Sequence, residues 1–352
     1  MPPSQTNINL ASIKQAVQHN CHIADASAAG NFTLCIYLLK MREFYRWESG
    51  YNYGDVLPRE EVGNWLRERE ALWESLQEEG FTQIPINGEL FDPFDSQTIN
   101  SKLTPQRLVY SGGLGHRTNA HFFLGVLERH EHHHGFDIIV VADEYARDLT
   151  APPAMSQGKT IYIRREAMRR MVWEKYEQWL WNKPDNALGR ALAFYPFDSN
   201  LDSALEQMTN NELDAAVLHE IGEVNAYRLL GSDWEDILYQ LPHSKLELLL
   251  RAARDHLADC TSTLPQLAKA RNVASIHFYI ANLNNLRKDL FPGLLSAYET
   301  WREQQDYDVL LEIADKGTSH WQQVCEEVLD RHSKIDHNSH SELVSYLESK
   351  KF

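Results

Sequence analysis

The sequence predicts an α+β fold in which helices predominate and a small sheet of three or four strands lies in the middle of the chain. Amphipathic helical patterns fill most of the second half of the 352 residues, whereas short apolar runs separated by glycine, proline and polar turns are concentrated between 106 and 165. We therefore distinguish an N-terminal helical region (1–105), a small sheet region (106–165) and a C-terminal helical region (166–352), which form one compact unit or two closely packed domains.

The N-terminal region is predicted to contain a buried helix from Asn31 to Trp47. Asn31 suits an N-cap, and residues 32–39 are apolar almost all round, as is typical of a helix without a solvent face. A charged amphipathic helix is predicted over residues 59–79.

The middle region contains four candidate strands, at 107–110, 121–127, 136–142 and 159–164. The second and third form a hairpin, or a helix followed by a strand. The histidine-rich segment 130–134 between them is expected to be a polar loop tip. Arg147 follows the third run; it either holds a substrate anion or, as the preferred interpretation, forms an ordinary ion pair with Glu144 or Asp148.

From Glu166 onward almost every segment predicts a helix. The predicted helices are 166–182, 200–208, 211–230, 233–240, 245–260, 264–287, 292–304, 307–330 and 340–350. The third of these has the clearest ends, because Thr209 and Glu212 fit a capping box and Gly231 stands where a glycine stop belongs.

Composition excludes several classes of protein. The formal net charge is −16, from 34 basic and 50 acidic residues, so the surface repels nucleic acid and anionic membranes. No apolar run approaches the roughly 20 residues that span a bilayer, and the first residues do not resemble a secretory signal. We expect a cytoplasmic protein. Its four cysteines form no CxxC pair and are expected to be free, buried small hydrophobes. No phosphate-binding glycine motif follows a strand, so a nucleotide cofactor is not indicated.

The strongest chemical signal is the segment LHEIGE at 218–223 within the predicted helix. On a helical wheel His219 and Glu223 lie about 40° apart and Glu220 about 100° from His219. Side chains one turn apart can converge on one ion, and imidazole with carboxylate suits zinc, iron or manganese. Glu220 would then lie beside the ion, where a base for a metal-bound water belongs.

Two other interpretations of this segment stay open, a buried hydrogen-bonded network and an exposed polar face. Gly222 costs about 1 kcal/mol in a helix interior and therefore needs a packing reason. The apolar neighbours of the charged residues predict a largely buried helix, and buried charges need partners or a metal.

The segment resembles the zincin metallopeptidase motif, HExxH on a helix. His219 and Glu220 match its first histidine and catalytic glutamate, and Gly222 matches a glycine that many zincins carry. Glu223 replaces the second histidine, which leaves one neutral ligand where that family has two. The resemblance covers about a dozen residues and implies a zinc-dependent hydrolase. As a whole, the chain resembles uncharacterised bacterial proteins, and that resemblance implies no residue roles.

The next predicted helix offers the remaining metal ligands. It carries Asp255, His256 and Asp259, and one carboxylate or histidine from it would complete a three-ligand open site. The alternative is a solvated acidic face balanced by Arg251 and Arg254.

Three functions are compatible with these patterns. The leading hypothesis is a metal-dependent hydrolase, with zinc as the metal and an unknown small molecule or peptide as the substrate. The second is a carboxylate-bridged di-iron or di-manganese oxidative enzyme in a helical bundle, which Glu223 and the number of helices favour. The third is a non-enzymatic helical scaffold or interaction protein, for which nine tryptophans and fifteen tyrosines could build a partner surface.

Overall fold

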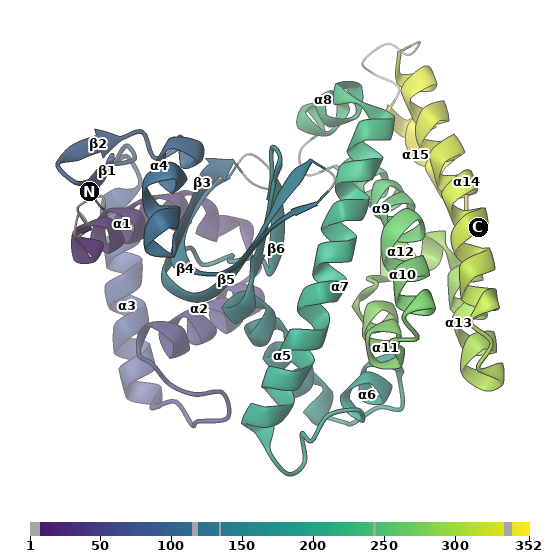
Figure 1. Cartoon of the computed structure of the whole chain (residues 1–352), viewed down its shortest axis with the longest axis horizontal. Coiled ribbons are helices and arrows are strands. Elements are labelled where there is room, and N and C mark those ends of the chain that lie inside the picture. Colours follow the sequence, from purple (N-terminus) through teal and green to yellow (C-terminus); the bar gives the residue numbers. More distant parts are fainter. Residues whose placement is uncertain (1–7, 115–118, 134, 242–243, 334–339) are drawn as a thin grey trace, which may run out of the picture. The chain divides into compact units, whose positions relative to one another are not determined.

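The structure is a computed structural model that describes residues 8–114, 119–133, 135–241, 244–333 and 340–352 (Figure 1). It divides into two compact units, an N-terminal unit (Met1–Trp173) and a C-terminal unit (Glu174–Phe352). Helices predominate, and the strands lie in the middle of the chain. These features confirm the predicted helix-dominant α+β class.

The N-terminal unit combines helices with two sheets. Its helices are α1 (Leu10–Ala28), α2 (Leu34–Glu48), α3 (Arg59–Leu76) and α4 (Ser96–Leu103), with short 3₁₀ turns η1 (Ala29–Asn31) and η2 (Thr104–Gln106). Helix α5 (Arg165–Leu180) begins in this unit and ends in the C-terminal unit. A two-stranded sheet joins β1 (Ile84–Ile86) to β2 (Glu89–Phe91).

The larger sheet has five strands in the order β3-β4-β5-β7-β6. They are β3 (Leu108–Leu114), β4 (Ala120–His133), β5 (Phe136–Arg147), β6 (Ala154–Gln157) and β7 (Thr160–Arg164). The first three form an antiparallel meander, β7 runs parallel to β5, and β6 pairs with β7 in the antiparallel sense. All four predicted strands are present, and β6 is an additional one.

The histidine-rich segment belongs to β4, so the predicted loop tip is wrong over its described residues. The strand pairing of β4 with β5 continues to the pair His133–Phe136. Across the strands, His130 Nε2 lies 3.0 Å and His132 Nδ1 3.4 Å from Oδ1 of Asp137. These imidazole–carboxylate pairs stabilise strand pairing where a polar loop was expected. His134, also in the predicted loop, lies outside the described residues.

Gly125 allows β4 to bend against β5. The register between these strands shifts on either side of Gly125. A Cβ atom at this position would lie 2.4 Å from Cγ1 of Val141 and 2.8 Å from the carbonyl oxygen of Asp143. Glycine is therefore the residue that lets the bulged strands approach closely.

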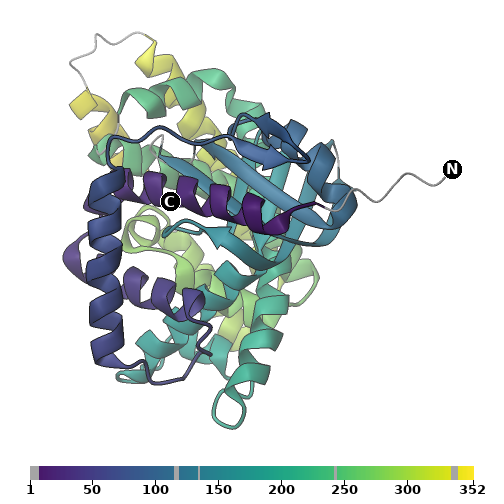
Figure 2. The same cartoon turned by 90° about the vertical axis from the view of Figure 1, so that its left-hand side faces the viewer.

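Helix α1 covers one face of the larger sheet (Figure 2). Its apolar side packs on alternate strand residues: Ile13, Val17, Cys21 and Ala24 contact a core that includes Tyr110, Phe122, Leu124 and Ala146. The opposite face carries the intervening residues, Val109, Phe123, Ile139, Val141 and Tyr162. The period-two alternation of the strands thus divides the apolar side chains between two cores.

The predicted burial of residues 32–39 is wrong. Helix α2 begins at Leu34, and Leu34 and Leu39 are 71% and 53% exposed. The helix packs instead through its second half, where Met41 and Phe44 are buried. When apolar residues lie on every side of a helix, the sequence pattern does not determine which side packs against a neighbour. Cys35 on the same turn is exposed, although the other three cysteines are buried as expected.

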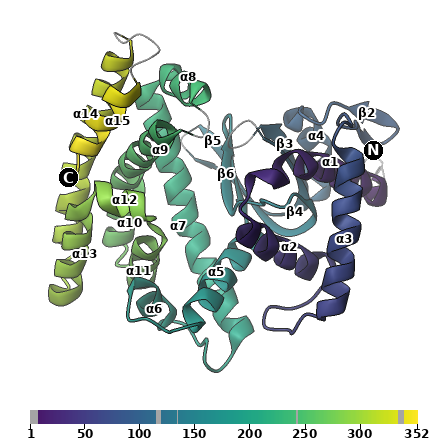
Figure 3. The same cartoon turned by 180° about the vertical axis from the view of Figure 1, so that it is seen from behind.

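The described residues of the C-terminal unit form helices joined by loops, without a strand. Its elements are α6 (Ala187–Leu192), α7 (Leu201–Leu230), α8 (Ser232–Gln240), α9 (Lys245–Ala258), the π-helical turn η4 (Asp259–Thr263), α10 (Leu264–Lys269), α11 (Val273–Asn282), α12 (Asn285–Leu290), α13 (Pro292–Gln304), α14 (Asp308–His332) and α15 (His340–Ser349). Helix α9 lies beside α7 in two opposite views (Figures 1 and 3), and α14 packs on α9. The predicted helix 264–287 is divided into α10, α11 and the start of α12.

Helix α7 is one continuous helix, so the predicted boundary near Thr209 is wrong. Asn200 is its N-cap and accepts a hydrogen bond from the backbone N–H of Ser203 (3.0 Å). Thr209 is fully buried in the helix interior, where its side chain cannot cap a terminus. The expected C-terminal stop is confirmed, because Gly231 follows the helix with φ of 76°.

Buried leucines, tryptophans and alanines of α7–α15 form the core of the C-terminal unit. Trp234, Trp301 and Trp321 are among its largest buried side chains. Within the described ranges, none of the helices combines the length and apolar character needed to cross a bilayer.

Candidate functional site

The motif segment 218–223 lies on α7 where this helix touches the end of α9. A Cβ atom on Gly222 would lie 2.4 Å from the carbonyl oxygen of Ala258, a distance that real Cβ contacts do not show. The hydroxyl of Ser262 donates a hydrogen bond to the carbonyl oxygen of Leu218 (2.7 Å). Gly222 therefore has the packing reason predicted for it: α7 and the α9–η4 segment are in contact through their backbones.

The close approach brings charged residues of three segments together. We call them the α7–η4 cluster: His219, Glu220, Glu223, Arg254, Asp255, Asp259 and Arg287. The π-helical turn begins at Asp259, and such turns are frequent at functional sites because they re-aim a side chain within a helix.

Asp259 holds the imidazole of His219 in place. Nδ1 of His219 lies 2.8 Å from Oδ1 of Asp259, which also accepts a hydrogen bond from the hydroxyl of Thr263 (2.9 Å). Oδ2 of Asp259 accepts from Arg287. Burial by itself raises the pKa of Asp259, but Arg287 and His219 outweigh it and hold this pKa far below the usual range. An ionised carboxylate only accepts hydrogen bonds, so Nδ1 of His219 carries a proton.

The other ring nitrogen of His219 faces Glu223. Nε2 lies 3.5 Å from Oε1 of Glu223, and one third (33%) of the His219 side chain is exposed. Burial lowers the pKa of His219, but the charges of Asp259 and Glu223 outweigh it and raise this pKa well above the ordinary value. The imidazole is therefore a protonated group whose Nδ1 is anchored by Asp259 and whose Nε2 faces Glu223, on a side chain that is partly exposed.

Glu223 forms an ion pair with Arg254. Nη2 of Arg254 donates to Oε1 of Glu223 at 2.9 Å and lies 3.2 Å from Oδ1 of Asp255. Burial raises the pKa of Glu223, but Arg254 and then His219 outweigh it and lower the pKa to about 2. Glu223 is thus ionised and already engaged by two cationic groups.

Glu220 differs from its neighbours because it is buried and forms no ion pair with any described residue, although His219 and Arg254 are near enough to lower its pKa. It is 6% exposed, and its Oε2 has no hydrogen-bond partner within the described part of the chain. Burial, followed by the negative charge of Glu223, raises the pKa of Glu220 to about 8. A buried carboxyl group that titrates near neutral pH is typical of acid–base sites and also of some structural networks.

The remaining candidates of the second helix are placed differently. Asp255 lies beside Arg254, and burial raises its pKa. His256 is fully buried, with its ring stacked 4.9 Å from the ring of Trp321 and its Nε2 3.0 Å from the carbonyl oxygen of Arg287. His256 is thus a core residue that packs away from the motif segment. Asp255 and Asp259, in contrast, lie among the charged residues near that segment.

The donor set does not fit a metal ion as the side chains stand. Among the described residues, no group of three or more histidine, cysteine, aspartate or glutamate side chains is arranged to hold one. Arg254 engages Glu223 and Arg287 engages Asp259, so two of the expected ligands already have cationic partners. The metal site stays a prediction that requires these arginines to move.

The sequence patterns did not indicate Arg287 as a site residue, although its charge is the largest influence that lowers the pKa of Asp259. It lies on α12. The available signal was an arginine at the end of the largely apolar predicted helix 264–287, which predicts a buried charge with a partner. His277, in the same predicted helix, is buried, with Nδ1 2.8 Å from the hydroxyl of Tyr298.

A second buried charged cluster lies in the N-terminal unit. Glu144 on β5 pairs with the fully buried Arg164 on β7, and Nη1 of Arg147 lies 3.8 Å from Glu144. The preferred ion pair of Arg147 with Glu144 is therefore confirmed. The carboxylate of Glu166 on α5 accepts the backbone N–H of Glu144 (2.6 Å), and burial and the Glu144 charge raise its pKa to about 7. This cluster connects two strands and a helix.

Comparison with known proteins assigns the chain at the level of a family. No curated protein and no solved structure matches it. Family models match residues 12–164 and 169–350, ranges that follow the two units of the structure. The chain belongs to the family of unknown function DUF6866, with its N-terminal domain at residues 12–164 and its C-terminal domain at residues 169–350.

Proposed function

We propose that the C-terminal unit catalyses a hydrolytic reaction at the α7–η4 cluster, with His219 as general acid and Glu220 as general base. The observation that carries this proposal is the 2.8 Å contact between Nδ1 of His219 and Oδ1 of the buried Asp259. A buried aspartate that anchors one imidazole nitrogen leaves the other oriented for proton transfer.

The pKa values of the two groups suit opposite roles. His219 keeps its proton at neutral pH because Asp259 and Glu223 outweigh the effect of burial. Glu220 loses its proton near pH 8, since its pKa is about 8. An imidazolium that keeps its proton and a carboxyl group that has lost its proton can provide an acid and a base at the same pH.

The proposed step is balanced in protons. The Glu220 carboxylate removes a proton from a water molecule as the water oxygen bonds to the electrophilic atom of the substrate. The His219 imidazolium transfers its Nε2 proton to the leaving group as that bond breaks. Transfer of the proton from Glu220 to His219 then restores the starting state, and the net reaction adds water across one bond.

The test measures hydrolysis of p-nitrophenyl esters and p-nitrophenyl phosphate by the full-length protein between pH 5 and 10. We expect a bell-shaped profile, with a rise near pH 8, and a loss of about 10²–10⁴-fold in rate for Glu220→Gln and for His219→Ala. Glu206→Gln, at an exposed glutamate on the same helix, is the matched control and retains the rate. Equal rates for Glu220→Gln and Glu206→Gln would refute the role of Glu220.

A zincin-like metal site is the second candidate. The specific observation in its favour is that a carboxylate orients His219 through Nδ1, as carboxylates commonly orient metal-bound histidines. Nε2 of His219 and Glu223 would hold the ion after Arg254 releases Glu223, and zinc would supply an activated water to Glu220. Metal analysis of protein purified without chelators distinguishes the possibilities: one zinc that His219→Ala abolishes, two iron or manganese ions for the oxidative alternative, or no stoichiometric metal for the acid–base site.

A further inference from the structure

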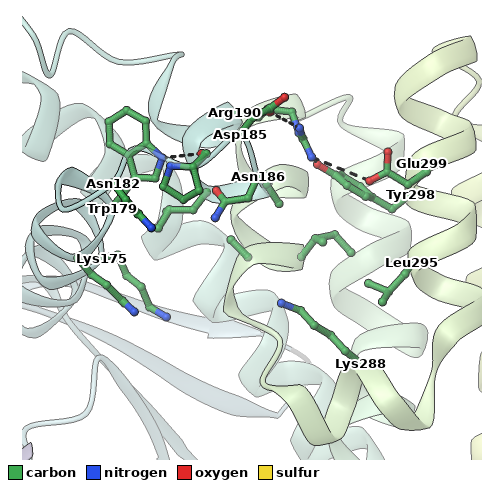
Figure 4. A pocket seen from close by; sticks show the side chains of 16 residues that line it. Lys175, Trp179, Asn182, Asp185, Asn186, Arg190, Lys288, Leu295, Tyr298 and Glu299 are labelled. Atoms are coloured by element: carbon green, nitrogen blue, oxygen red, sulfur yellow. Dashed lines mark hydrogen bonds and ion pairs between the residues drawn. The ribbon is translucent and has the colours of Figure 1, made fainter.

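The C-terminal unit contains a cavity whose lining residues include none of the α7–η4 cluster. Its volume is about 650 Å³, within the range of small-molecule sites. The end of α5, the segment that leads to α6, and helices α6, α11, α12 and α13 contribute its walls (Figure 4). Every lining residue belongs to the C-terminal unit.

Two lysines extend into this cavity from different helices. Lys175 on α5 and Lys288 on α12 both line it, and their side chains point into the same space (Figure 4). Neither ammonium group has an ion pair or hydrogen bond within the described part of the chain. Burial, and then the positive charge of Lys288, lower the pKa of Lys175, whereas Glu174 raises it. The two cations therefore repel each other in a partly desolvated space.

The acidic groups around the cavity are directed elsewhere. Asp185 is 2.7 Å and Glu299 4.0 Å from the guanidinium of Arg190, whose Nε also donates to the hydroxyl of Tyr298 (3.2 Å). Arg190 thus uses its charge on two carboxylates, while neither lysine forms an ion pair with a described carboxylate. In a chain with net charge −16, two neighbouring lysines without an ion-paired carboxylate among the described residues are unexpected unless an anion completes the pair.

The cavity also has an apolar side. Trp179 lines it, and its indole N–H donates to the carbonyl oxygen of Pro184 (3.0 Å), which holds the ring in one orientation. Ile280 and Leu295 contribute further apolar surface. The cations suit an anionic group, and the indole and aliphatic side chains suit an apolar body. The cavity therefore matches an amphipathic small molecule.

We propose that this cavity binds a small organic anion, whose carboxylate or phosphate group lies between Lys175 and Lys288 and whose apolar part contacts Trp179, Ile280 and Leu295. The lysines provide charge-assisted hydrogen bonds, which are stronger than neutral ones. The bound anion removes the repulsion between the two ammonium groups. This site is independent of the hydrolytic site, although α12 contributes Arg287 to one and Lys288 to the other.

The test is isothermal titration calorimetry of the full-length protein with four probes: phenyl phosphate, benzoate, inorganic phosphate and benzyl alcohol. We expect saturable binding of phenyl phosphate or benzoate, weaker binding of inorganic phosphate and none of benzyl alcohol. The comparison of phenyl phosphate with benzoate identifies the preferred anionic group. Absence of saturable binding by both aromatic anions at millimolar concentration would overturn the proposal.

Matched variants locate the binding. Lys175→Met and Lys288→Met keep the aliphatic stem and should each weaken the better aromatic anion by about tenfold or more. Lys269→Met removes the same charge from an exposed position on α10 and should leave the affinity unchanged. Trp179→Leu should weaken the aromatic anion without changing inorganic phosphate. Should Lys175→Met fail to fold, Lys288→Met alone decides; equal affinity of Lys288→Met and Lys269→Met would overturn the proposal.

Discussion

Gly222 of α7 lies so close to Ala258 of α9 that a Cβ atom on the glycine would be 2.4 Å from the alanine carbonyl oxygen. The nearest atom belongs to the backbone and not to a flexible side chain. A side chain at position 222 could therefore be accommodated only if one of the two helices shifted. It sets the distance between the helix that carries His219 and the turn that carries Asp259. Three predictions concern this junction.

Gly222→Ala should destabilise the protein by about 1–3 kcal/mol, because overpacking against a backbone outweighs the better helix propensity of alanine. Urea unfolding followed by circular dichroism measures the change. Gly63→Ala on α3 is the control, since a Cβ there meets nothing within 4 Å and alanine should stabilise that helix. Unchanged or increased stability of Gly222→Ala would contradict the close contact.

Asp259→Asn should lower the pKa of His219, because the aspartate is the largest favourable influence on the imidazolium. NMR titration of the imidazole C–H resonances gives this value, with His219→Ala used to assign the signal. Asp233→Asn, at an exposed residue of α8, should leave the pKa unchanged. The same pKa in both variants would show that Asp259 does not hold the ring.

Glu220→Gln should be more stable than the parent chain at pH 8. The difference between the two free energies of unfolding should grow by about 1–3 kcal/mol from pH 4 to pH 8. The folded pKa of Glu220 is about 8, above the ordinary value of 4.5. Between these values the folded state binds a proton that the unfolded state has lost, so parental stability falls as pH rises through this window. Unfolding midpoints measured across the window should diverge between the two proteins. Parallel pH profiles would contradict a raised pKa.

Arg164→Met should destabilise the N-terminal unit by about 3–5 kcal/mol, because it removes the nearer of the two cations that pair with the buried Glu144 carboxylate and leaves only the longer contact with Arg147. Adding Glu144→Gln to this variant should restore part of the loss in urea unfolding. Arg165→Met is the control, since Arg165 pairs with Glu128 at a partly exposed position and its loss should cost less than about 1 kcal/mol. Equal losses at the two arginines would argue against a special role of burial.

Cys35 should be the cysteine that reacts rapidly with a thiol reagent in the folded protein. It is exposed on α2, whereas Cys21, Cys260 and Cys325 are buried and burial raises the pKa of each thiol. Labelling with a chromogenic disulfide should therefore give one fast equivalent, which Cys35→Ser removes, and three slow ones that react on unfolding. A second fast equivalent in the native protein would contradict the burial of the other cysteines.

The main features of the fold follow from local sequence patterns. Alternation in 107–164 predicts the strands of the larger sheet, and helical periodicity predicts the helices of the C-terminal unit, because both depend on neighbours a few residues apart. The predictions are wrong where one sequence pattern is compatible with two structures. Thr209 fits a capping box yet lies inside α7, and residues 32–39 are apolar on every side, so the sequence alone does not choose the buried side.

For the candidate site, the sequence by itself determined that His219, Glu220 and Glu223 share a region of one helix, since helical spacing brings them there. Only the tertiary structure decided their partners. Contacts between residues far apart in the chain depend on how helices pack, and here Gly222 permits the approach that gives Asp259 to His219, while α12 gives Arg287 to Asp259. Those long-range charges determine which groups hold protons, and no local pattern encodes them.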